Sequence, residues 1–196
     1  SQDELAPQPV QALKKQRIKH ISCGWAFTVA LSHSGELFSW GENKHGQLGL
    51  GDTKDRFLPV MIDALQLPRT RDRPERTVKA LNVSCGGRHV VAVGTNGRVF
   101  TWGGVHRSAF LALGHGADRN IEVRQQARLV PGIGNAVHVA AGGTRDGAAS
   151  SLVVRADGAV LAASNEPNIF RPVLPLTAAT VWAAFSSCGP PSRKTM

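Results

Sequence analysis

The chain has 196 residues and a formal net charge of +9, with 23 Lys and Arg against 14 Asp and Glu and a sequence pI of about 10.3. This length suffices for one domain with a sizeable core, and the positive charge favours partners that carry phosphates or acidic side chains. Aromatic residues make up only 6%, which argues against a stacking platform for single-stranded nucleic acid, and the apolar stretches are too short to predict membrane insertion.

The N-terminal segment carries a proline signature and then a basic cluster. A Pro-Val pair at Pro9 returns at Pro59, and looser versions occur in residues 128–131 and 171–174. The basic cluster after the first pair consists of Lys14, Lys15, Arg17 and Lys19. Two interpretations are open for such a cluster, a contact with an anionic partner or a solvated loop.

Residues 22–41 and 84–103 carry one pattern at a single offset of 62 positions. The first copy reads SCGWAFTVALSHSGELFSWG and the second SCGGRHVVAVGTNGRVFTWG, with nine of twenty positions identical. A gap-free internal repeat predicts a repeat architecture, and it argues against most enzymes because a repeated unit is first a packing device. The identical pairs are Ser22/Ser84, Cys23/Cys85, Gly24/Gly86, Val29/Val91, Ala30/Ala92, Gly35/Gly97, Phe38/Phe100, Trp40/Trp102 and Gly41/Gly103.

Each copy has the local pattern of an antiparallel hairpin. The apolar runs at 27–31 and 90–93 have the length of a strand, and the turn dipeptides Ser-Gly and Asn-Gly follow them. After each turn, Phe and Trp alternate with an aliphatic residue and a hydroxyl, which places both aromatic side chains on one face of a strand. Four short strands per unit, repeated along the chain, are typical of a propeller blade rather than of a sandwich.

The segment after Trp40 is rich in glycine and reads GENKHGQLGLGD, with a looser version at 113–118. It fits neither GxGxxG nor GxxxxGK[ST] before a helix, so turn glycines explain it better than a phosphate-binding loop. The longer pattern WGENKHGQLGLGD, preceded by SCG and a glycine hairpin and followed by Pro-Val, resembles the regulator-of-chromosome-condensation repeat family. The family's usual His in the first strand has its match at His89, whereas Phe27 takes that place in the first copy.

A second basic cluster lies in the linker between the first two copies. Pro59 and Cys85 are 26 positions apart, whereas Pro9 and Cys23 are 14 apart, so this linker is longer by 12 residues. Alignment on SCG puts Arg17 opposite Lys79, and equivalent positions of neighbouring blades lie on one face of a propeller. We therefore expect one positive strip, extended by a projecting loop, although the loop also contains acidic residues. The second cluster consists of Arg69, Arg71, Arg73, Arg76 and Lys79.

Two further copies are weaker. The third covers residues 139–143 and 151–161, with about five extra residues between them, and the fourth starts at Val181 and reaches the SCG motif at Ser187. The resemblance implies a β-propeller, usually of seven blades. We predict an all-β fold with about three blades plus flanking strands, an open arc or a fragment of a larger propeller. The predicted bounds are 1–189 for the partial propeller, about 18–65, 80–131 and 137–174 for its repeats, 180–189 for the fourth, and 190–196 for a Pro-rich tail.

The cysteines, histidines and tryptophans favour structural roles. Cys23, Cys85 and Cys188 occupy one repeat position, so we expect small buried side chains in the first strand of each repeat, reduced and unpaired. This usage favours a reducing intracellular compartment, with nucleus, cytosol and mitochondrion left open. The histidine spacing predicts no metal site, and no cofactor is expected. Trp25 replaces Gly87 of the second copy and is a candidate exposed contact.

Three functional interpretations compete. The first is a non-catalytic scaffold that mediates protein–protein contacts within a larger assembly, with its arc ends covered by other subunits or by further blades of the same protein. The second, implied by the resemblance, is guanine-nucleotide exchange on a small GTPase together with chromatin binding. The third is binding of rRNA or DNA phosphates through the basic strip. No catalytic residues are assigned, so we predict that the chain is not an enzyme.

Overall fold

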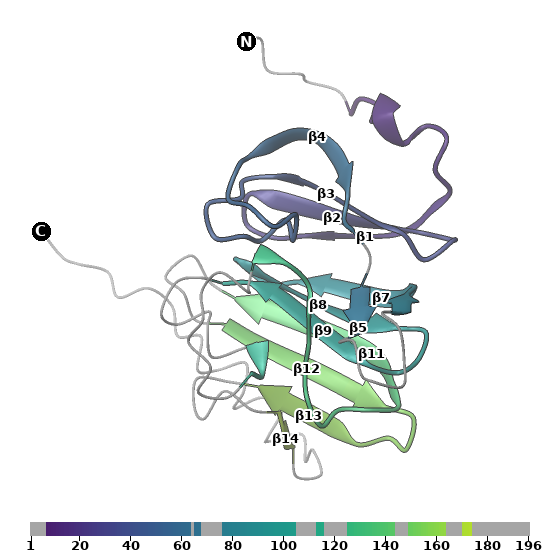
Figure 1. Ribbon diagram of the computed structural model, residues 1–196, viewed down its shortest axis with the longest axis vertical. Helices are drawn as coiled ribbons and strands as arrows, with labels where there is room; N and C mark the ends of the chain where they lie inside the picture. The colour runs from purple at the N-terminus through teal and green to yellow at the C-terminus, as the bar shows by residue number, and fades with distance from the viewer. Residues whose placement is uncertain are drawn as a thin grey trace, which may run out of the picture.

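The structure, a computed structural model, describes residues 7–63, 65–67, 76–104, 113–115, 125–143, 149–163 and 170–173. These residues form three four-stranded antiparallel sheets and one two-stranded hairpin, and Figure 1 shows the three sheets stacked on one another in chain order. This arrangement confirms the predicted all-β fold of propeller type. No helix in the described part of the chain has the length and apolar character needed to cross a membrane.

Each four-stranded sheet is one blade with sequential strand order. In the first, η1 (Gln11–Leu13) precedes β1 (Ile18–Cys23), β2 (Phe27–Ser32), β3 (Leu37–Gly41) and β4 (Arg56–Met61). The second holds β7 (Ala80–Cys85), β8 (His89–Gly94), β9 (Val99–Gly103) and β10 (Arg128–Leu129). The third holds β11 (Ala136–Gly143), β12 (Ala149–Arg155), β13 (Val160–Ala163) and β14 (Arg171–Pro172). The predicted fourth repeat and the tail lie outside the described residues.

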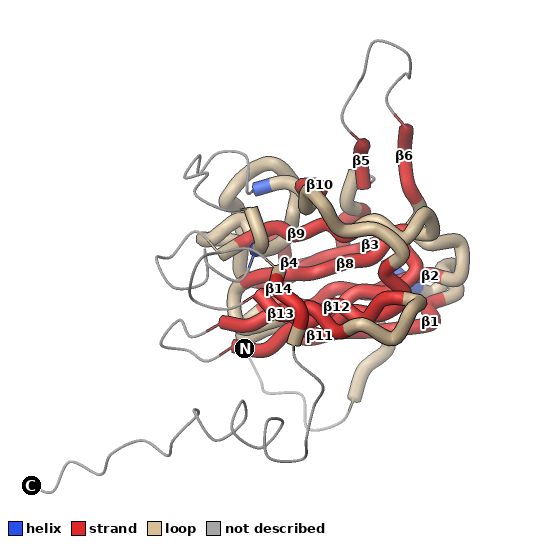
Figure 2. Tube along the Cα trace, turned by 90° about the horizontal axis from the view of Figure 1, so that it is seen from below, coloured by secondary structure: helices blue, strands red, loops and turns tan. Residues whose placement is uncertain are grey.

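The long linker between the first two blades forms a separate hairpin. Its strands are β5 (Leu65–Leu67) and β6 (Arg76–Val78), paired antiparallel. Figure 2 shows both strands standing away from the three blades. The described parts of this linker therefore lead away from the blades instead of lengthening one of them.

The glycines of the repeat make room for specific neighbours. A Cβ atom at Gly24 would collide with the ring of Phe27, and one at Gly86 would collide with the imidazole of His89. The turn glycines Gly35 and Gly97 have φ of +81° and +71°, a backbone conformation that L side chains rarely adopt. The SCG and hairpin glycines are thus explained by steric requirements of the blade.

The hydrophobic core lies between the blades. One cluster joins β2 residues of the first blade, such as Val29 and Leu31, to Phe100 and Trp102 on β9 of the second. Another cluster joins the opposite face of the second blade to the third, with Val153 among its members. The second blade therefore buries both of its faces, and the first and third blades each bury the face that meets it.

Equivalent hydrogen bonds join each blade to the next. The Ser22 hydroxyl accepts the N–H of Cys85 at 2.9 Å, and the Ser84 hydroxyl accepts the N–H of Ala141 at 2.9 Å. The carbonyl groups of the two turn glycines make a second such pair, accepting the N–H groups of Ala80 and Ala136 at 2.9 and 3.0 Å. The serine of the SCG motif is thus a connection between neighbouring blades.

The expectation that the cysteines are buried is wrong for one of them. Cys23 and Cys85 are free thiols at the ends of β1 and β7, the first strands of their blades, as predicted. Cys85 is buried against the first blade, and burial raises the pKa of its thiol to about 12. Cys23 is exposed because no described residues form a blade on its side of β1. Cys188 lies outside the described residues.

Candidate partner-binding surfaces

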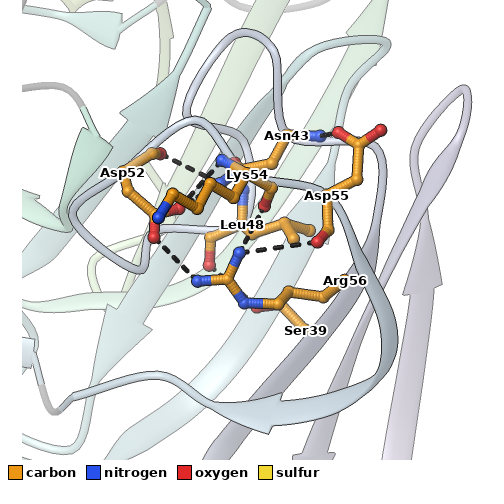
Figure 3. A network of polar contacts seen from close by, with 7 residues as sticks. All are labelled: Ser39, Asn43, Leu48, Asp52, Lys54, Asp55 and Arg56. Atoms are coloured by element: carbon orange, nitrogen blue, oxygen red, sulfur yellow. Dashed lines mark hydrogen bonds and ion pairs between the residues drawn. The ribbon is translucent and has the colours of Figure 1, made fainter.

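The glycine-rich loop between β3 and β4 is held by a buried asparagine. Asn43 donates from Nδ2 to the backbone carbonyl and Oδ1 of Asp52, at 2.9 and 3.1 Å, and its Oδ1 accepts the N–H of Leu48 at 2.9 Å. Ser39 on β3 donates to the Leu48 carbonyl at 2.8 Å. Figure 3 shows these side chains converging inside the loop. The loop's polar groups are therefore engaged with one another.

Charged side chains close the same loop. Arg56 forms an ion pair with Asp52 at 2.7 Å and donates to the Lys54 carbonyl at 2.7 Å, while Asp55 accepts the N–H of Asn43 at 2.8 Å. The hydrogen bond from Arg56 is the main reason why the pKa of Asp52 is lowered. Within the described ranges, no group of three or more His, Cys, Asp or Glu side chains is arranged to hold a metal ion.

The loop's outer part contacts the second blade. The indole N–H of Trp102 donates to the Gln47 carbonyl at 3.0 Å, and Gly49 lies directly beside that indole. Further along, Leu50 forms a β-bridge with Gln126, next to β10. The loop is thus a connection between blades, which supports the prediction of turn glycines over a phosphate-binding loop.

The basic strip is exposed where the structure describes it. Arg17 and Lys79 occupy equivalent backbone positions, because their carbonyls accept the N–H groups of His33 and Thr95, each at 2.8 Å. These contacts place both residues at the end of the blades where the β2–β3 and β8–β9 turns lie. The exposed members are Lys14, Lys15, Arg17, Lys19 and Lys79. Arg69, Arg71, Arg73 and the side chain of Arg76 lie outside the described residues.

Two neighbours modify the charge of this strip. Glu36 lies 3.8 Å from Lys79, so part of that lysine's charge is compensated at the surface. Arg98, in the β8–β9 turn, is exposed at the same end and adds a positive charge. Sequence reasoning missed Arg98 because it stands alone in the repeat pattern, outside both basic clusters.

Trp25 is exposed but lies away from the basic strip. Its exposed fraction is 47%, and the guanidinium of Arg88 lies 5.7 Å from the centre of its ring, within the range of a cation–π contact. Trp25 follows the end of β1, whereas Arg17 precedes its beginning, and six strand residues span roughly 20 Å. The structure therefore does not bring the two predicted contact sites together.

His89 is a core residue between the second and third blades. Its Nε2 lies 3.0 Å from the Ser151 hydroxyl, and the side chain is fully buried. Desolvation lowers the pKa of the imidazole to about 4, so the ring is neutral at pH 7. The position held by His89 is taken by buried Phe27 in the first blade. Both residues fill blade interfaces.

Sequence comparison agrees with this repeat anatomy. The pattern of the Regulator of chromosome condensation (RCC1) repeat matches residues 1–31 and 34–93, and a second RCC1 repeat pattern matches residues 18–47. The chain is an RCC1 repeat protein. It is similar to the Ultraviolet-B receptor UVR8 of Arabidopsis thaliana, with 37% identity over 67% of this chain and 27% of the receptor.

A second relative is the Probable E3 ubiquitin-protein ligase HERC6 of Homo sapiens, 34% identical over 74% of this chain and 13% of that protein. The RCC1 repeat chain thus spans about a quarter or less of these relatives. The ligase match covers too small a part of HERC6 to transfer its activity.

Solved structures share the fold of this RCC1 repeat protein. Human WBSCR16 has a TM-score of 0.64 and 21% identity, over 85% of this chain and 39% of that one. Prp20p of Saccharomyces cerevisiae, described with its binding properties to Gsp1p and histones, has a TM-score of 0.60 and 19% identity, over 83% and 39%. At these identities the likeness shows the fold alone.

Proposed function

We propose that this RCC1 repeat protein is a non-catalytic scaffold that holds protein partners in a larger assembly, with the basic strip as its contact for an anionic partner. The observation that carries the proposal is the equivalence of Arg17 and Lys79 at one end of adjacent blades, beside three further exposed lysines. Same-sign charges placed side by side by a rigid fold attract an anionic surface more strongly than scattered charges do.

The partner of the strip is either an acidic protein surface or the phosphates of rRNA or DNA. A sheet surface with few exposed aromatic side chains offers no means of stacking bases, so contact with nucleic acid would be to the backbone without sequence readout. The protein partner is the first candidate, as the scaffold proposal requires.

A double charge reversal tests the strip. The variant R17E/K79E removes two equivalent positions, and K44E/K54E is a control with the same change in net charge at the β3–β4 loop, toward the other end of the blades. We expect the first to weaken binding to a 20-base-pair DNA duplex or to a polyglutamate peptide at least tenfold more than the second. A flatter salt dependence for the duplex alone would assign the strip to phosphates. Equal effects of both variants would contradict the proposal.

We also propose that the arc ends are covered by other subunits or by further blades. The far face of the third blade exposes Leu152, and the first blade exposes Ile21, Phe57 and Leu58. Large apolar patches are uncommon on a protein without a partner. Mass measurement of residues 1–196 in solution tests this: self-association supports covered ends, and a monodisperse, cooperatively folding monomer contradicts them.

Guanine-nucleotide exchange on a small GTPase is the second candidate. The observation that favours it is the β5–β6 hairpin, an element that projects from the blades and offers a contact beyond the propeller face (Figure 2). The test is release of labelled GDP from a panel of small GTPases by the intact protein and by a variant with residues 68–75 replaced by a short glycine–serine linker, which keeps the buried Leu65 and Val78 in place. Release that depends on the hairpin supports exchange, and no release from any GTPase contradicts it.

A further inference from the structure

A cleft opens at the base of the β5–β6 hairpin, between the hairpin and the first blade. Its volume is about 250 Å³, and its walls come from the β2–β3 turn, the end of β4 and the start and end of the hairpin. Pockets for drug-sized ligands run from about 300 to 1,000 Å³, so this space suits one or two amino-acid side chains better than a cofactor. The cleft exists because the longer linker stands beside the blade instead of joining it.

The floor of the cleft is apolar and fixed. Leu37, Ile62, Leu65 and Val78 line it, and all four are buried members of the core that joins the first two blades. The Ile62 N–H donates to the Leu37 carbonyl at 2.9 Å, which fixes the wall on the blade side. Such a floor is preorganised for an apolar side chain, because little conformational freedom is lost on binding.

The lip of the cleft is adaptable. Met61 lines the opening, and half of its side chain is exposed. Methionine is unbranched and polarisable, so it adjusts to differently shaped apolar groups. The cleft therefore combines a rigid floor with a lip that accepts either aliphatic or aromatic side chains.

The charge at the rim opposes the charge of the whole chain. Lys79 lines the cleft, but its charge is matched by Glu36 at 3.8 Å. Asp63 is exposed at the rim and has no ion pair among the described residues. In a chain of net charge +9, this rim carries one uncompensated negative charge. A cation next to an apolar group complements it, and a phosphate does not.

We infer that this cleft binds an extended segment of a protein partner, which places an aliphatic or aromatic side chain on the apolar floor and a neighbouring Lys or Arg beside Asp63. The inference rests on the proposed scaffold function and names the chemistry of one partner. β6 pairs only with β5 among the described strands, so its second edge has backbone groups for an added strand, a common mode of peptide recognition. The cleft shares Lys79 with the basic strip, but its uncompensated charge, at Asp63, selects the opposite sign.

The test uses methyl NMR on the intact protein labelled at methionine, since the chain has only two methionines, Met61 and Met196. The probe is N-acetyl-Leu-Lys-amide, and the comparison probes are N-acetyl-Leu-Glu-amide and N-acetyl-Gly-Lys-amide. We expect a saturable shift of the Met61 signal with the first probe, at a dissociation constant of about 1–10 mM for so small a ligand. The Glu probe should bind about two- to fivefold more weakly, and the Gly probe should cause no saturable shift.

The variant D63N should remove the preference for Lys over Glu, and the control D157N, an exposed Asp in the third blade, should keep it. Unchanged Met61 signals in the unbound variants show that both fold.

The inference fails if the Leu-Lys probe causes no saturable shift up to roughly tenfold above that range, if the Gly-Lys probe binds equally well, or if D63N keeps the preference. A DNA duplex that shifts Met61 competitively would also overturn it. Because D63N leaves Arg17 and Lys79 unchanged, failure of the strip and failure of the cleft are read separately.

Discussion

Two equivalent sheet faces of this molecule have opposite environments. The face of the second blade that carries Val83 and Trp102 is covered by the first blade, and their exposed fractions are 1% and 0%. In the first blade the equivalent residues are Ile21, which is 57% exposed, and Trp40, which is only half-buried. The repeat thus gives each blade an apolar sheet face suited to packing. Whether solvent reaches that face depends on the presence of a neighbouring blade.

The outer strands show the same contrast. Leu129 on β10 pairs with Phe100, and Met61 on β4 pairs with Phe38, so β10 and β4 are the equivalent outer strands of their blades. The Gln125 carbonyl accepts the N–H of Gly51 from the first blade's loop at 2.9 Å. On β4, no loop among the described residues covers Phe57, which is 94% exposed. A preceding repeat with a similar glycine-rich loop would cover it.

The largest expected effect is on stability and compares the two tryptophans. W102A removes a fully buried side chain and its hydrogen bond to Gln47, so we expect a loss of about 3–5 kcal/mol in the free energy of unfolding. W40A should cost about 1–2 kcal/mol, because part of that indole is already in water. Urea unfolding of both variants measures the difference. Equal losses in the intact protein would show that a further repeat covers the first blade.

The second effect concerns the two blade interfaces and pH. In the folded state the imidazole of His89 takes up a proton only near pH 4, whereas a histidine in the unfolded chain does so near pH 6.5. The free energy of unfolding should therefore fall by about 3 kcal/mol as the pH drops from 6.5 to 4, and His89 should contribute no pH dependence above that window.

The double variant H89F/S151V checks this prediction, because it copies the apolar pair Phe27 and Val90 of the other interface into this one. Chemical denaturation at pH 7 and at pH 4.5 should show a smaller pH dependence for the variant than for the natural chain. An unchanged pH dependence would mean that acid destabilises the protein through other groups.

Two interblade hydrogen bonds should instead behave alike. S22A and S84A each leave a backbone N–H without its partner, that of Cys85 or of Ala141. We expect each substitution to cost about 1–2 kcal/mol, because the lost bond is partly buried. A clearly smaller cost for S84A than for S22A in urea unfolding would show that the third blade packs more loosely than the second.

The repeat offset of 62 predicted the hairpins and blades well, because strand and turn signals are local and recur in register. The exposure of Cys23 was not predictable from the same pattern, since exposure depends on a neighbour that the residue's own repeat does not encode. The basic residues were predicted to be exposed, and those described are exposed. The cleft was missed because Leu65 and Val78 lie far apart in the linker sequence, and only their pairing across the hairpin brings them to the blade.

The mildest test compares how fast the thiols of Cys23 and Cys85 react, and it leaves the packing of the blades unchanged. In a C188S background, a soluble maleimide should label Cys23 rapidly, because the thiol is exposed at the end of β1. Cys85 should react at least about a hundredfold more slowly, because its buried thiol stays protonated and reaction requires the first two blades to open. Both thiols should react alike in urea, which serves as the control. Similar native rates would mean that the first two blades separate readily. Protection of Cys23 on addition of a partner would place that partner on the open face of the first blade.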